Sequence, residues 1–349
     1  MAIDEGTVAA AAQRLIDGQL VAFPTETVYG LGADAEQPAA VARIYAAKGR
    51  PSNHPVIVHV APHADIAYWA DPVPDEARAL MAAFWPGPLT LILKRAAHVP
   101  DCVSGGQDSV GLRCPSHPVA QGLLSAFAAA KPGGQGGVAA PSANRFGHVS
   151  PTQADHVRTE FADEVSQGMP VLEGGPTEVG IESTIIDVSG IHQGRAATLL
   201  RPGHISAEQI SHVLGYLPLA PDARAPRASG TLKAHYAPHT PVELVSASRL
   251  GEIVGGIDMP DGVRWVVLSF VTAPAGIDPR VTWHAISGDP QGYARMLYAA
   301  LRELDREGYD RIVVHQPPAT AQWAAVNDRI GRAGAAFDLS IDPSSMGGE

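Results

Sequence analysis

The chain has 349 residues, a formal net charge of −11 and only two cysteines. The acidic balance without a basic tail argues against a protein that coats nucleic acid in bulk, although it leaves room for a local basic groove. Two cysteines make neither a structural zinc site nor a disulfide scaffold, and no apolar run reaches transmembrane length, so we expect a cytoplasmic protein outside the membrane.

The first two hundred residues alternate predicted helices with short apolar strands. Helices are expected over residues 6–17, 39–48 and 75–85, the second ending at Gly49 where a helix C-cap glycine belongs. The segments LVAF, VIVHV, LTLILK, SVGLR, VAAPSA, STIIDV and TLLR are typical of strands. Residues 24–35 are interpreted as a glycine-punctuated loop. This alternation predicts an α/β fold with a sheet that is covered on both faces.

A change in composition near residue 206 predicts a second domain. Residues 219–241 are rich in Pro, Ala and Arg, which is typical of a linker between domains. Beyond them, PVELV, VRWVVLSF and RIVVHQ read as strands, with helices over residues 290–307 and 320–333. We therefore expect a larger domain over residues 1–205, a linker over 206–240 and a smaller Rossmann-like α/β domain over 241–349.

Strand parity places several polar side chains on shared faces. In SVGLR, Ser109 and Arg113 lie on one face, which forms an anion-recognition pair unless the arginine simply faces solvent from an edge strand. In VIVHV, His59 is the one polar side chain, and a hydrogen-bonded core histidine is the alternative to a ligand contact. In STIIDV, Ser183 and Asp187 share a face, or merely cap the ends of the strand.

Four cations lie beside Gly or Pro at predicted element ends: Lys48, Arg50, Arg113 and Arg201. In an acidic chain this arrangement suggests a pocket for a polyanion such as a nucleoside triphosphate, although four unrelated surface charges are the alternative. The chain lacks the glycine-rich phosphate loop and the G-x-S-x-G nucleophile elbow. His235 and His239 are four residues apart, but Pro238 breaks a helical metal-binding face between them, so a metal site is unfavoured.

Seven ordered motifs carry a specific resemblance. They are FPTETVYGLGADA, KGRPSNHPVIVHV, WPGPLTLIL, VGLRCPSHP, PSANRFGHVSPT, GIESTIID and LLRPG, and they cover about residues 8–205. This part of the chain closely resembles the YrdC-type threonylcarbamoyl-AMP synthases, and the tail SGTLKAHYAPHTP with its second α/β unit resembles the long, two-domain form. The resemblance implies a twisted mixed sheet with a concave, positively charged face.

The resemblance also implies a nucleotidyltransferase reaction. L-threonine, bicarbonate and ATP, with Mg²⁺, give threonylcarbamoyl-AMP and pyrophosphate, and downstream tRNA threonylcarbamoyl-transferase machinery then modifies an adenosine of tRNA. The implied threonine site is Thr27, His59, Arg113, Ala140 and Ser183. The implied ATP site is Arg50, His54, Ser109, Ser142, Asn144, Ser150, Arg201 and the linker residue Tyr236. Lys48 and Arg50 are the expected catalytic cations; the sequence names no Mg²⁺ ligand and does not decide direct tRNA binding.

Two features qualify this reading. The family usually has Asn-Pro where this chain has His54-Pro55, and a histidine replaces only one hydrogen bond of an amide. The segment SGTLKAHYAP is expected to close over the site as a lid, with a plain tether as the alternative.

Two competing functions fit the sequence less well. A related carbamoyl-adenylate enzyme of the hydrogenase-maturation type is disfavoured because zinc-finger cysteine pairs are missing. An RNA-binding module is disfavoured by the acidic charge.

Overall fold

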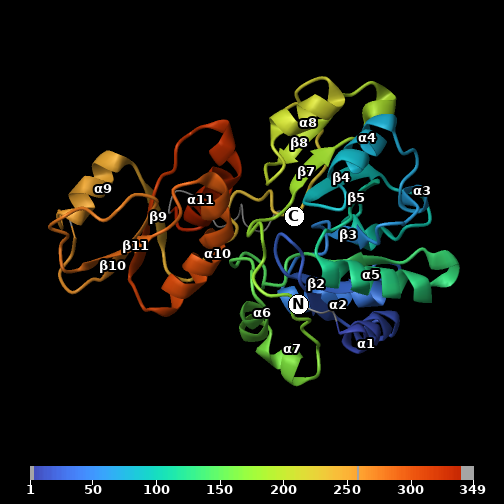
Figure 1. Cartoon of the computed structure of the whole chain (residues 1–349), viewed down its shortest axis with the longest axis horizontal. Helices are drawn as coiled ribbons and strands as arrows, with labels where there is room; N and C mark the ends of the chain where they lie inside the picture. Colours follow the sequence, from blue (N-terminus) through green and yellow to red (C-terminus); the bar gives the residue numbers. More distant parts are fainter. Residues whose placement is uncertain (1–3, 258, 339–349) are drawn as a thin grey trace. The chain divides into compact units, whose positions relative to one another are not determined.

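The computed structural model describes residues 4–257 and 259–338 (Figure 1). The chain divides into two compact units, which are described separately below. The larger unit runs up to Phe146 and resumes over Ser150–Thr231. The second unit contains Gly147–Val149 and the chain from Leu232 onward. No helix in the part of the chain described here is both long and apolar enough to cross a membrane.

The larger unit is built on a mixed eight-stranded sheet of order β1-β2-β6-β3-β5-β4-β7-β8. The β3–β5 and β4–β7 pairs are parallel and the other neighbours are antiparallel. This confirms the predicted twisted mixed α/β architecture. The strands are β1 (Val21–Phe23), β2 (Gly30–Asp34), β3 (Ile57–Val60), β4 (Leu89–Lys94), β5 (Ser109–Arg113), β6 (Gly137–Ala139), β7 (Thr184–Asp187) and β8 (Thr198–Arg201).

Strand β2 corrects the prediction of a loop over residues 24–35. Its glycines signalled a loop, but Gly32 lies where a Cβ atom would be 2.8 Å from the side chains of both Phe23 and Val138. Glycine inside a strand often marks such a close approach rather than a turn. The sequence signal was therefore genuine, and its physical cause was packing between neighbouring strands.

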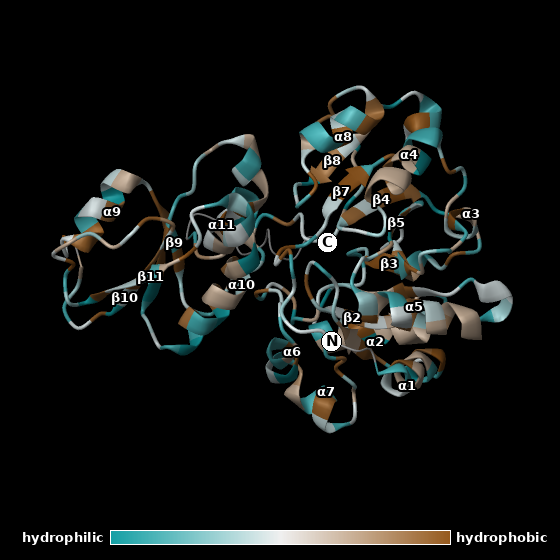
Figure 2. Cartoon of the chain, in the orientation of Figure 1, coloured by the Kyte–Doolittle hydropathy of each residue, from teal (hydrophilic) through white to brown (hydrophobic). Residues whose placement is uncertain are grey.

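Helices pack on both faces of the sheet, but they leave part of the second face to other segments. On the first face, the main core joins Val58, Leu91 and Leu112 to side chains of the helices α2 (Pro38–Lys48), α3 (Ile66–Trp69), α4 (Asp75–Phe84) and α8 (Ala207–Leu214). On the second face, α1 (Glu5–Ile16) and α5 (Pro118–Ala130) pack on β1 and β6. The short helices α6 (Ala154–Glu160) and α7 (Ala162–Ser166) adjoin β2 through a cluster around Phe161. Strand β7 is strongly apolar while α8 carries polar stretches (Figure 2).

The rest of the second face carries an apolar strip with no helical residue packed on it. The strip consists of Ile57, Ile92, Ile185 and Leu200, from four different strands, and Ala225 and Ala228 cover it. The sheet is therefore covered on this half of the second face too, as predicted, but the cover here is not a helix. A segment that looked like a linker in sequence does the covering.

The predicted linker over 206–240 begins with a helix that belongs to the larger unit. Ser206 caps α8 through a capping box with Gln209, and Ile210 is fully buried in the main core. Because the following residues also lie on the sheet, the larger unit extends to Thr231, past the boundary at residue 205 that the sequence suggested. The segment from Ala225 to Thr231 is called the sheet-covering segment below.

The second unit has a four-stranded parallel sheet of order β11-β10-β12-β9, as a Rossmann-like prediction requires. Its strands are β9 (Val242–Val245), β10 (Trp265–Ser269), β11 (Val281–Ala285) and β12 (Arg311–His315), and its helices α9 (Ala247–Val254), α10 (Pro290–Arg306) and α11 (Ala324–Ala335). The sequence reading missed α9 and β11. The first spans only two turns, and the second is a half-exposed edge strand with a weak apolar pattern.

The close packing of Gly137, in β6, against the Trp69 ring leads to a prediction about stability. An added Cβ would lie 2.5 Å from the buried Trp69 ring and 2.7 Å from Val58. We expect Gly137→Ala to lower the free energy of unfolding by about 1–3 kcal/mol, because neither neighbour has room to move. Chemical denaturation measures this change. Gly6→Ala in α1, where the nearest atom is 3.4 Å away, is the control and should leave stability unchanged or slightly raised.

Candidate active site

Three predicted site residues meet at the centre of the second sheet face. His59 of β3 and Arg113 of β5 are directly paired across neighbouring parallel strands. Ala140, just after β6, donates its backbone N–H to the Ile57 carbonyl oxygen at 2.9 Å, which brings it to the other side of β3. All three are buried. The sheet register therefore assembles residues that are far apart in sequence, and it places the predicted His59 face of β3 beside the predicted Arg113 face of β5.

Thr27 lies beside this group with its hydroxyl in a defined orientation. The Thr25 hydroxyl donates to the Val28 carbonyl oxygen at 2.7 Å, so its single proton is used. The 2.8 Å bond between the two threonine hydroxyls is then donated by Thr27. Because a hydroxyl has one proton and two lone pairs, Thr27 Oγ1 is left as an acceptor. It is suited to a ligand that offers an N–H or O–H group.

The Arg113 guanidinium is held by an acidic neighbour that sequence reasoning missed. Arg113 Nη2 donates to Glu26 Oε1 at 2.7 Å, and both side chains are about 95% buried. The other Glu26 oxygen accepts the Ser116 N–H at 3.1 Å. A lone acidic residue within the otherwise uncharged segment FPTETVYG was the available signal, because a buried arginine requires a partner.

His59 is kept neutral by its surroundings. Burial, reinforced by the Arg113 charge, lowers the pKa of His59 to about 3. The Phe23 ring packs edge-on against the imidazole at a centroid distance of 6.1 Å. A neutral imidazole has one N–H donor and one acceptor nitrogen, so His59 can contact a polar ligand without adding charge.

Lys48 fixes the loop that carries Ser142 and Asn144. The lysine is the last residue of α2, and its Nζ donates to the carbonyl oxygens of Ser142, at 2.7 Å, and of Asn144. Its own carbonyl accepts the Phe146 N–H at 2.8 Å. Burial, then the Arg50 charge, lowers the pKa of Lys48. The described contacts make Lys48 a support for this loop.

Arg50 and Arg201 are joined by the sheet-covering segment. Arg50 Nη2 donates to the Pro55 carbonyl oxygen at 2.8 Å and lies 3.4 Å from Ser229 Oγ. Arg201 Nη1 donates to the Ser229 carbonyl oxygen at 2.8 Å, while its Nε and Nη2 donate to the Ser183 carbonyl oxygen. Both guanidiniums are buried, and Ser229 lies between them.

Ser183 connects Arg201 to the rest of the face. Its hydroxyl lies 2.7 Å from Thr90 Oγ1 on β4 and accepts from Arg201 Nη2 at 3.2 Å. Asp187, the other polar residue of the predicted STIIDV pattern, accepts the Ser189 N–H at 2.9 Å and so ends its strand. The two side chains thus share a face, as predicted, but Ser183 bonds to other site residues while Asp187 caps its own strand.

The remaining predicted residues of the larger unit are His54, Ser150 and Ser109, and His54 shares a neighbour with Arg50. The His54 ring packs edge-on against Phe146 at 5.4 Å, and burial lowers the pKa of His54. The Arg50 guanidinium lies 5.8 Å from the centroid of the same Phe146 ring. Ser150 donates to Glu182 Oε1 at 2.5 Å. Ser109 is buried at the start of β5, four residues before Arg113.

Tyr236 belongs to the second unit. Its ring packs against Tyr298 at a centroid distance of 5.7 Å and against the Arg329 guanidinium at 5.4 Å, and its φ angle is +63°. Of the doubtful metal pair, His239 Nδ1 lies 3.0 Å from Asp305 Oδ2. Within residues 4–257 and 259–338, no group of three or more His, Cys, Asp or Glu side chains is arranged to hold a metal ion.

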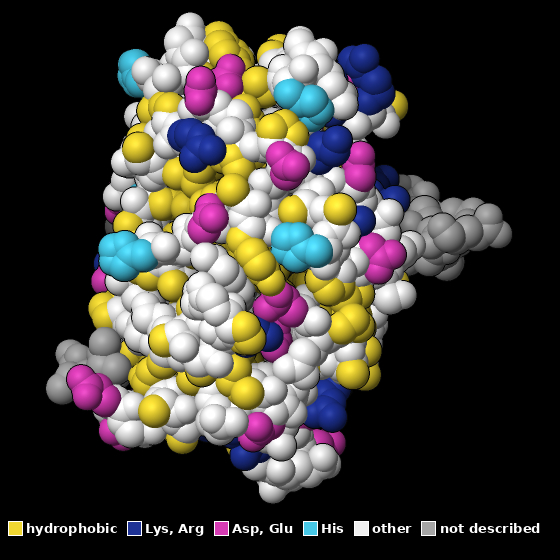
Figure 3. Space-filling model, turned by 90° about the vertical axis from the view of Figure 1, so that its right-hand side faces the viewer, with side chains coloured by type: hydrophobic (Ala, Val, Ile, Leu, Met, Phe, Trp, Pro, Cys, Tyr) yellow, Lys and Arg dark blue, Asp and Glu magenta, His cyan; other side chains and the backbone are white. Residues whose placement is uncertain are grey.

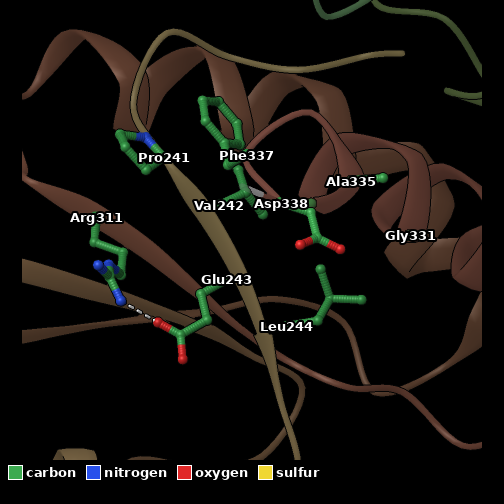
Figure 4. Close-up of a pocket in the computed structure, with 10 residues that line it drawn as sticks. Pro241, Val242, Glu243, Leu244, Arg311, Gly331, Ala335, Phe337 and Asp338 are labelled. Atoms are coloured by element: carbon green, nitrogen blue, oxygen red, sulfur yellow. Dashed lines mark hydrogen bonds and ion pairs between the residues drawn. The ribbon is translucent and has the colours of Figure 1, made fainter. Parts of the chain in front are cut away.

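A groove of about 490 Å³ in the second unit lies apart from all predicted site residues. It runs along β9, where Arg311 pairs with Glu243, and past the small residues Gly331 and Ala335 of α11 (Figure 4). Arg311 and Glu243 already pair with each other there. The chemistry-bearing cluster of the larger unit is the stronger candidate site, and Ser229 and Ala228 occupy part of its space.

The surface charges give no support to a nucleic-acid coat. On the face seen in Figure 3, Lys and Arg side chains are interspersed with Asp, Glu and His, and they do not merge into a broad basic patch. The cations of the candidate site are instead buried and individually bonded, as Arg50, Arg113 and Arg201 show. This pattern is typical of a small anionic ligand.

Two family models together match most of the chain. The first, Sua5_yciO_yrdC, described as "Telomere recombination", matches residues 13–203. The second, described as "Threonylcarbamoyl-AMP synthase, C-terminal domain", matches residues 205–335.

Curated and solved relatives agree with these matches. The chain is 35% identical over 342 residues to a threonylcarbamoyl-AMP synthase of Pyrococcus abyssi, covering 95% of each chain. It is 35% identical over 343 residues to one of Bacillus subtilis, covering 95% of this chain and 94% of the relative. The crystal structure of P. abyssi Sua5 complexed with L-threonine superposes with a TM-score of 0.83, at 34% identity, and covers 96% of both chains.

The lowered pKa of His59 predicts a pH-dependent stability. Below pH 6.5 the unfolded chain binds a proton at this ring that the folded chain, with a pKa of about 3, does not bind. The free energy of unfolding should therefore fall as the pH drops from 6.5 toward 4, by up to about 1.4 kcal/mol per pH unit from this ring.

Urea unfolding at pH 7 and pH 5 tests this slope, with NMR titration of the His59 ring as a direct readout. His59→Gln should reduce the slope, leaving the part due to His54, His204 and His315, whose pKa values burial also lowers. An imidazole that titrates near pH 6.5 in the folded protein would contradict the assignment.

Proposed function

This chain belongs to the threonylcarbamoyl-AMP synthase family in its two-domain form, and we propose that it is an L-threonylcarbamoyladenylate synthase. As a nucleotidyltransferase it would convert L-threonine, bicarbonate and ATP to threonylcarbamoyl-AMP and pyrophosphate. The observation that carries the proposal is the second sheet face, where buried polar groups suited to a carboxylate and to phosphates lie on neighbouring strands beside an apolar strip that a non-helical segment covers.

The threonine end of the site is Thr27, His59, Arg113, Ala140 and Ser183. A guanidinium recognises a carboxylate through parallel N–H bonds, which is the role of Arg113. Thr27 Oγ1 is free to accept, so it suits the amino or hydroxyl group of threonine. Neutral His59 adds a polar contact with no charge. Relatives named for threonylcarbamoyl-AMP, one of them solved with L-threonine, support this choice of substrate.

The ATP end comprises Arg50, His54, Ser109, Ser142, Asn144, Ser150 and Arg201, all of the larger unit. The two arginines suit phosphate oxygens because guanidinium forms bidentate, directional bonds. Ser142 and Asn144 lie in the loop that Lys48 supports, so Lys48 contributes by fixing backbone groups that face the nucleotide. Arg50 is then the catalytic cation that faces the triphosphate.

The reaction proceeds without an enzyme nucleophile. The neutral amine of threonine takes up CO₂ derived from bicarbonate, forming a carbamate and losing a proton. A carbamate oxygen attacks the α-phosphorus of ATP in line, a new O–P bond forms, and the bond to pyrophosphate breaks. Positioning and charge stabilisation supply the catalysis, as in other phosphoryl transfers. The buried arginines are suited to the charge that accumulates on the phosphates.

Mg²⁺ would accompany ATP. In nucleotide sites this ion usually keeps several waters and binds substrate phosphates plus one or two carboxylates. The residues present fit that pattern, because Glu182 is a buried carboxylate beside Ser150 and within the electrostatic reach of Lys48. Phosphate oxygens would supply most ligands, and Glu182 is the side chain able to add one. When bound, Mg²⁺ would neutralise charge on the departing pyrophosphate.

The product is a reactive mixed anhydride that requires an acceptor. The family relation supports transfer of the threonylcarbamoyl group to an adenosine of tRNA by downstream tRNA threonylcarbamoyl-transferase machinery. Nothing in the described cluster calls for tRNA itself, because its cations are buried and bonded one by one. The RNA-binding alternative gains no specific support.

Threonine- and bicarbonate-dependent release of pyrophosphate from ATP tests the proposed function. Arg50→Ala and Arg113→Ala should each reduce the rate by at least about 100-fold, since each removes a charge-assisted contact. Arg224→Ala, at an exposed arginine that pairs only locally with Asp222, is the control and should retain full activity. Pyrophosphate release that is indifferent to threonine would overturn the proposal.

We further propose that the sheet-covering segment forms part of a lid over the site. Gln107 and Arg227 hold each other by two bonds: the Gln107 amide donates to the Arg227 carbonyl at 3.1 Å, and the Arg227 N–H donates back at 2.7 Å. Closure would exclude water from a labile product. Tyr236 and the rest of SGTLKAHYAP follow directly in the chain.

Limited proteolysis tests the lid. Cleavage within residues 219–241 should slow at least severalfold when ATP and L-threonine are both present, because the segment closes again over the bound ligands after Ser229 has released Arg50 and Arg201. Cleavage elsewhere in the chain serves as the internal control. An unchanged rate within 219–241 would leave this segment a plain tether.

A further inference from the structure

The ion pair between Glu26 and Arg113 is the most completely buried charge pair at the candidate site. The exposed fractions of the two side chains are 4% and 5%. Glu26 is the residue before Thr27, and its backbone carbonyl accepts the Val179 N–H at 2.8 Å. Neither the sequence patterns nor the resemblance gives Glu26 a role.

Both oxygens of Glu26 accept hydrogen bonds, but only one of them accepts from Arg113. Oε1 accepts from Arg113 Nη2 at 2.7 Å, and Oε2 accepts the Ser116 N–H at 3.1 Å. Because the second bond is to backbone, the carboxylate itself is fixed. Arg113 Nε is also buried, but it has no hydrogen-bond partner. One edge of the guanidinium is therefore anchored, and a buried donor is left for something else.

A buried N–H of a charged group without a partner is costly, so it indicates a ligand. A carboxylate fits because it accepts from a guanidinium edge with both oxygens. We propose that Glu26 is a positioning residue for substrate: by anchoring Nη2, it orients Arg113 so that its remaining donors receive the carboxylate of L-threonine. This inference rests on the proposed function, because it takes threonine as the ligand of Arg113.

Loss of the Glu26 charge and loss of Arg113 orientation are expected to change the KM for L-threonine in opposite directions. Removing the Glu26 charge makes the electrostatic potential around Arg113 more positive. By Coulomb attraction alone, a substrate carboxylate would then bind more tightly. Loss of orientation acts in the opposite direction, because a long side chain must be ordered again for each binding event. The direction of the change in KM therefore separates the two effects.

The test compares Glu26→Gln with the wild type in the pyrophosphate-release assay. The amide keeps the shape but cannot accept from Arg113 and Ser116 through two oxygens. We expect KM for L-threonine to rise at least tenfold, while KM for ATP stays within twofold. Glu36→Gln is the matched control: it disrupts the Lys131–Glu36 pair, 3.2 Å long, at another edge of the same sheet. An unchanged or lower KM for L-threonine in Glu26→Gln would overturn the proposal.

L-threoninamide, which lacks the carboxylate, shows whether Glu26 acts through Arg113. The wild type should prefer L-threonine over the amide in kcat/KM, and Glu26→Gln should lose most of that preference. If the preference is unchanged while KM rises, Glu26 contacts another part of the substrate and the proposal is wrong.

Folding and function are controlled separately. Glu26→Asp keeps the charge but shortens the reach, and it should show the same selective rise in KM if Glu26→Gln does not fold. A wild-type protein without threonine-dependent pyrophosphate release would refute the proposed function itself. An active wild type with wild-type kinetics in both Glu26 variants would refute only the role of Glu26.

Discussion

The candidate site of the larger unit depends on how half of the second sheet face is shielded from water by a segment that is not a helix. Ile57, Ile92, Ile185 and Leu200 are apolar and require cover, while His59, Arg113 and Ser183 on the same face are the side chains proposed to contact threonine. A helix would bury both sets permanently. A short, Ala-containing segment with few contacts can cover the apolar strip and still be displaced at modest cost.

The same compromise explains the polar interior. Each buried cation of the site is held by carbonyl oxygens or a carboxylate, as in the bonds of Lys48 to its loop and of Arg113 to Glu26. Leaving such charges unpaired would be prohibitive in a protein interior, and pairing them fully would leave nothing for a ligand. The unused Nε of Arg113 and the acceptor at Thr27 Oγ1 mark where this balance leaves capacity.

Much of the fold was predictable because it rests on local patterns. Strand alternation placed His59 with Ile57, and Ser109 with Arg113, on the correct face. What could not be predicted depends on contacts between distant residues. Lys48 reaches carbonyls 94 and 96 residues away, and Ser229 lies 179 residues from Arg50, so no spacing rule indicates either. The strand at Gly30–Asp34 was missed because glycine signals both loops and close packing.

Ser229 has a consequence for how tightly the site holds its ligands. Its hydroxyl bonds to Arg50 and its carbonyl oxygen accepts from Arg201. A phosphate that binds either arginine thus competes with a group on the same polypeptide. The effective concentration of that group does not depend on the protein concentration. The apparent affinity for an anion equals the intrinsic affinity multiplied by the fraction of molecules in which Ser229 has moved away. Substitutions in this segment that never touch the ligand will therefore alter its measured affinity.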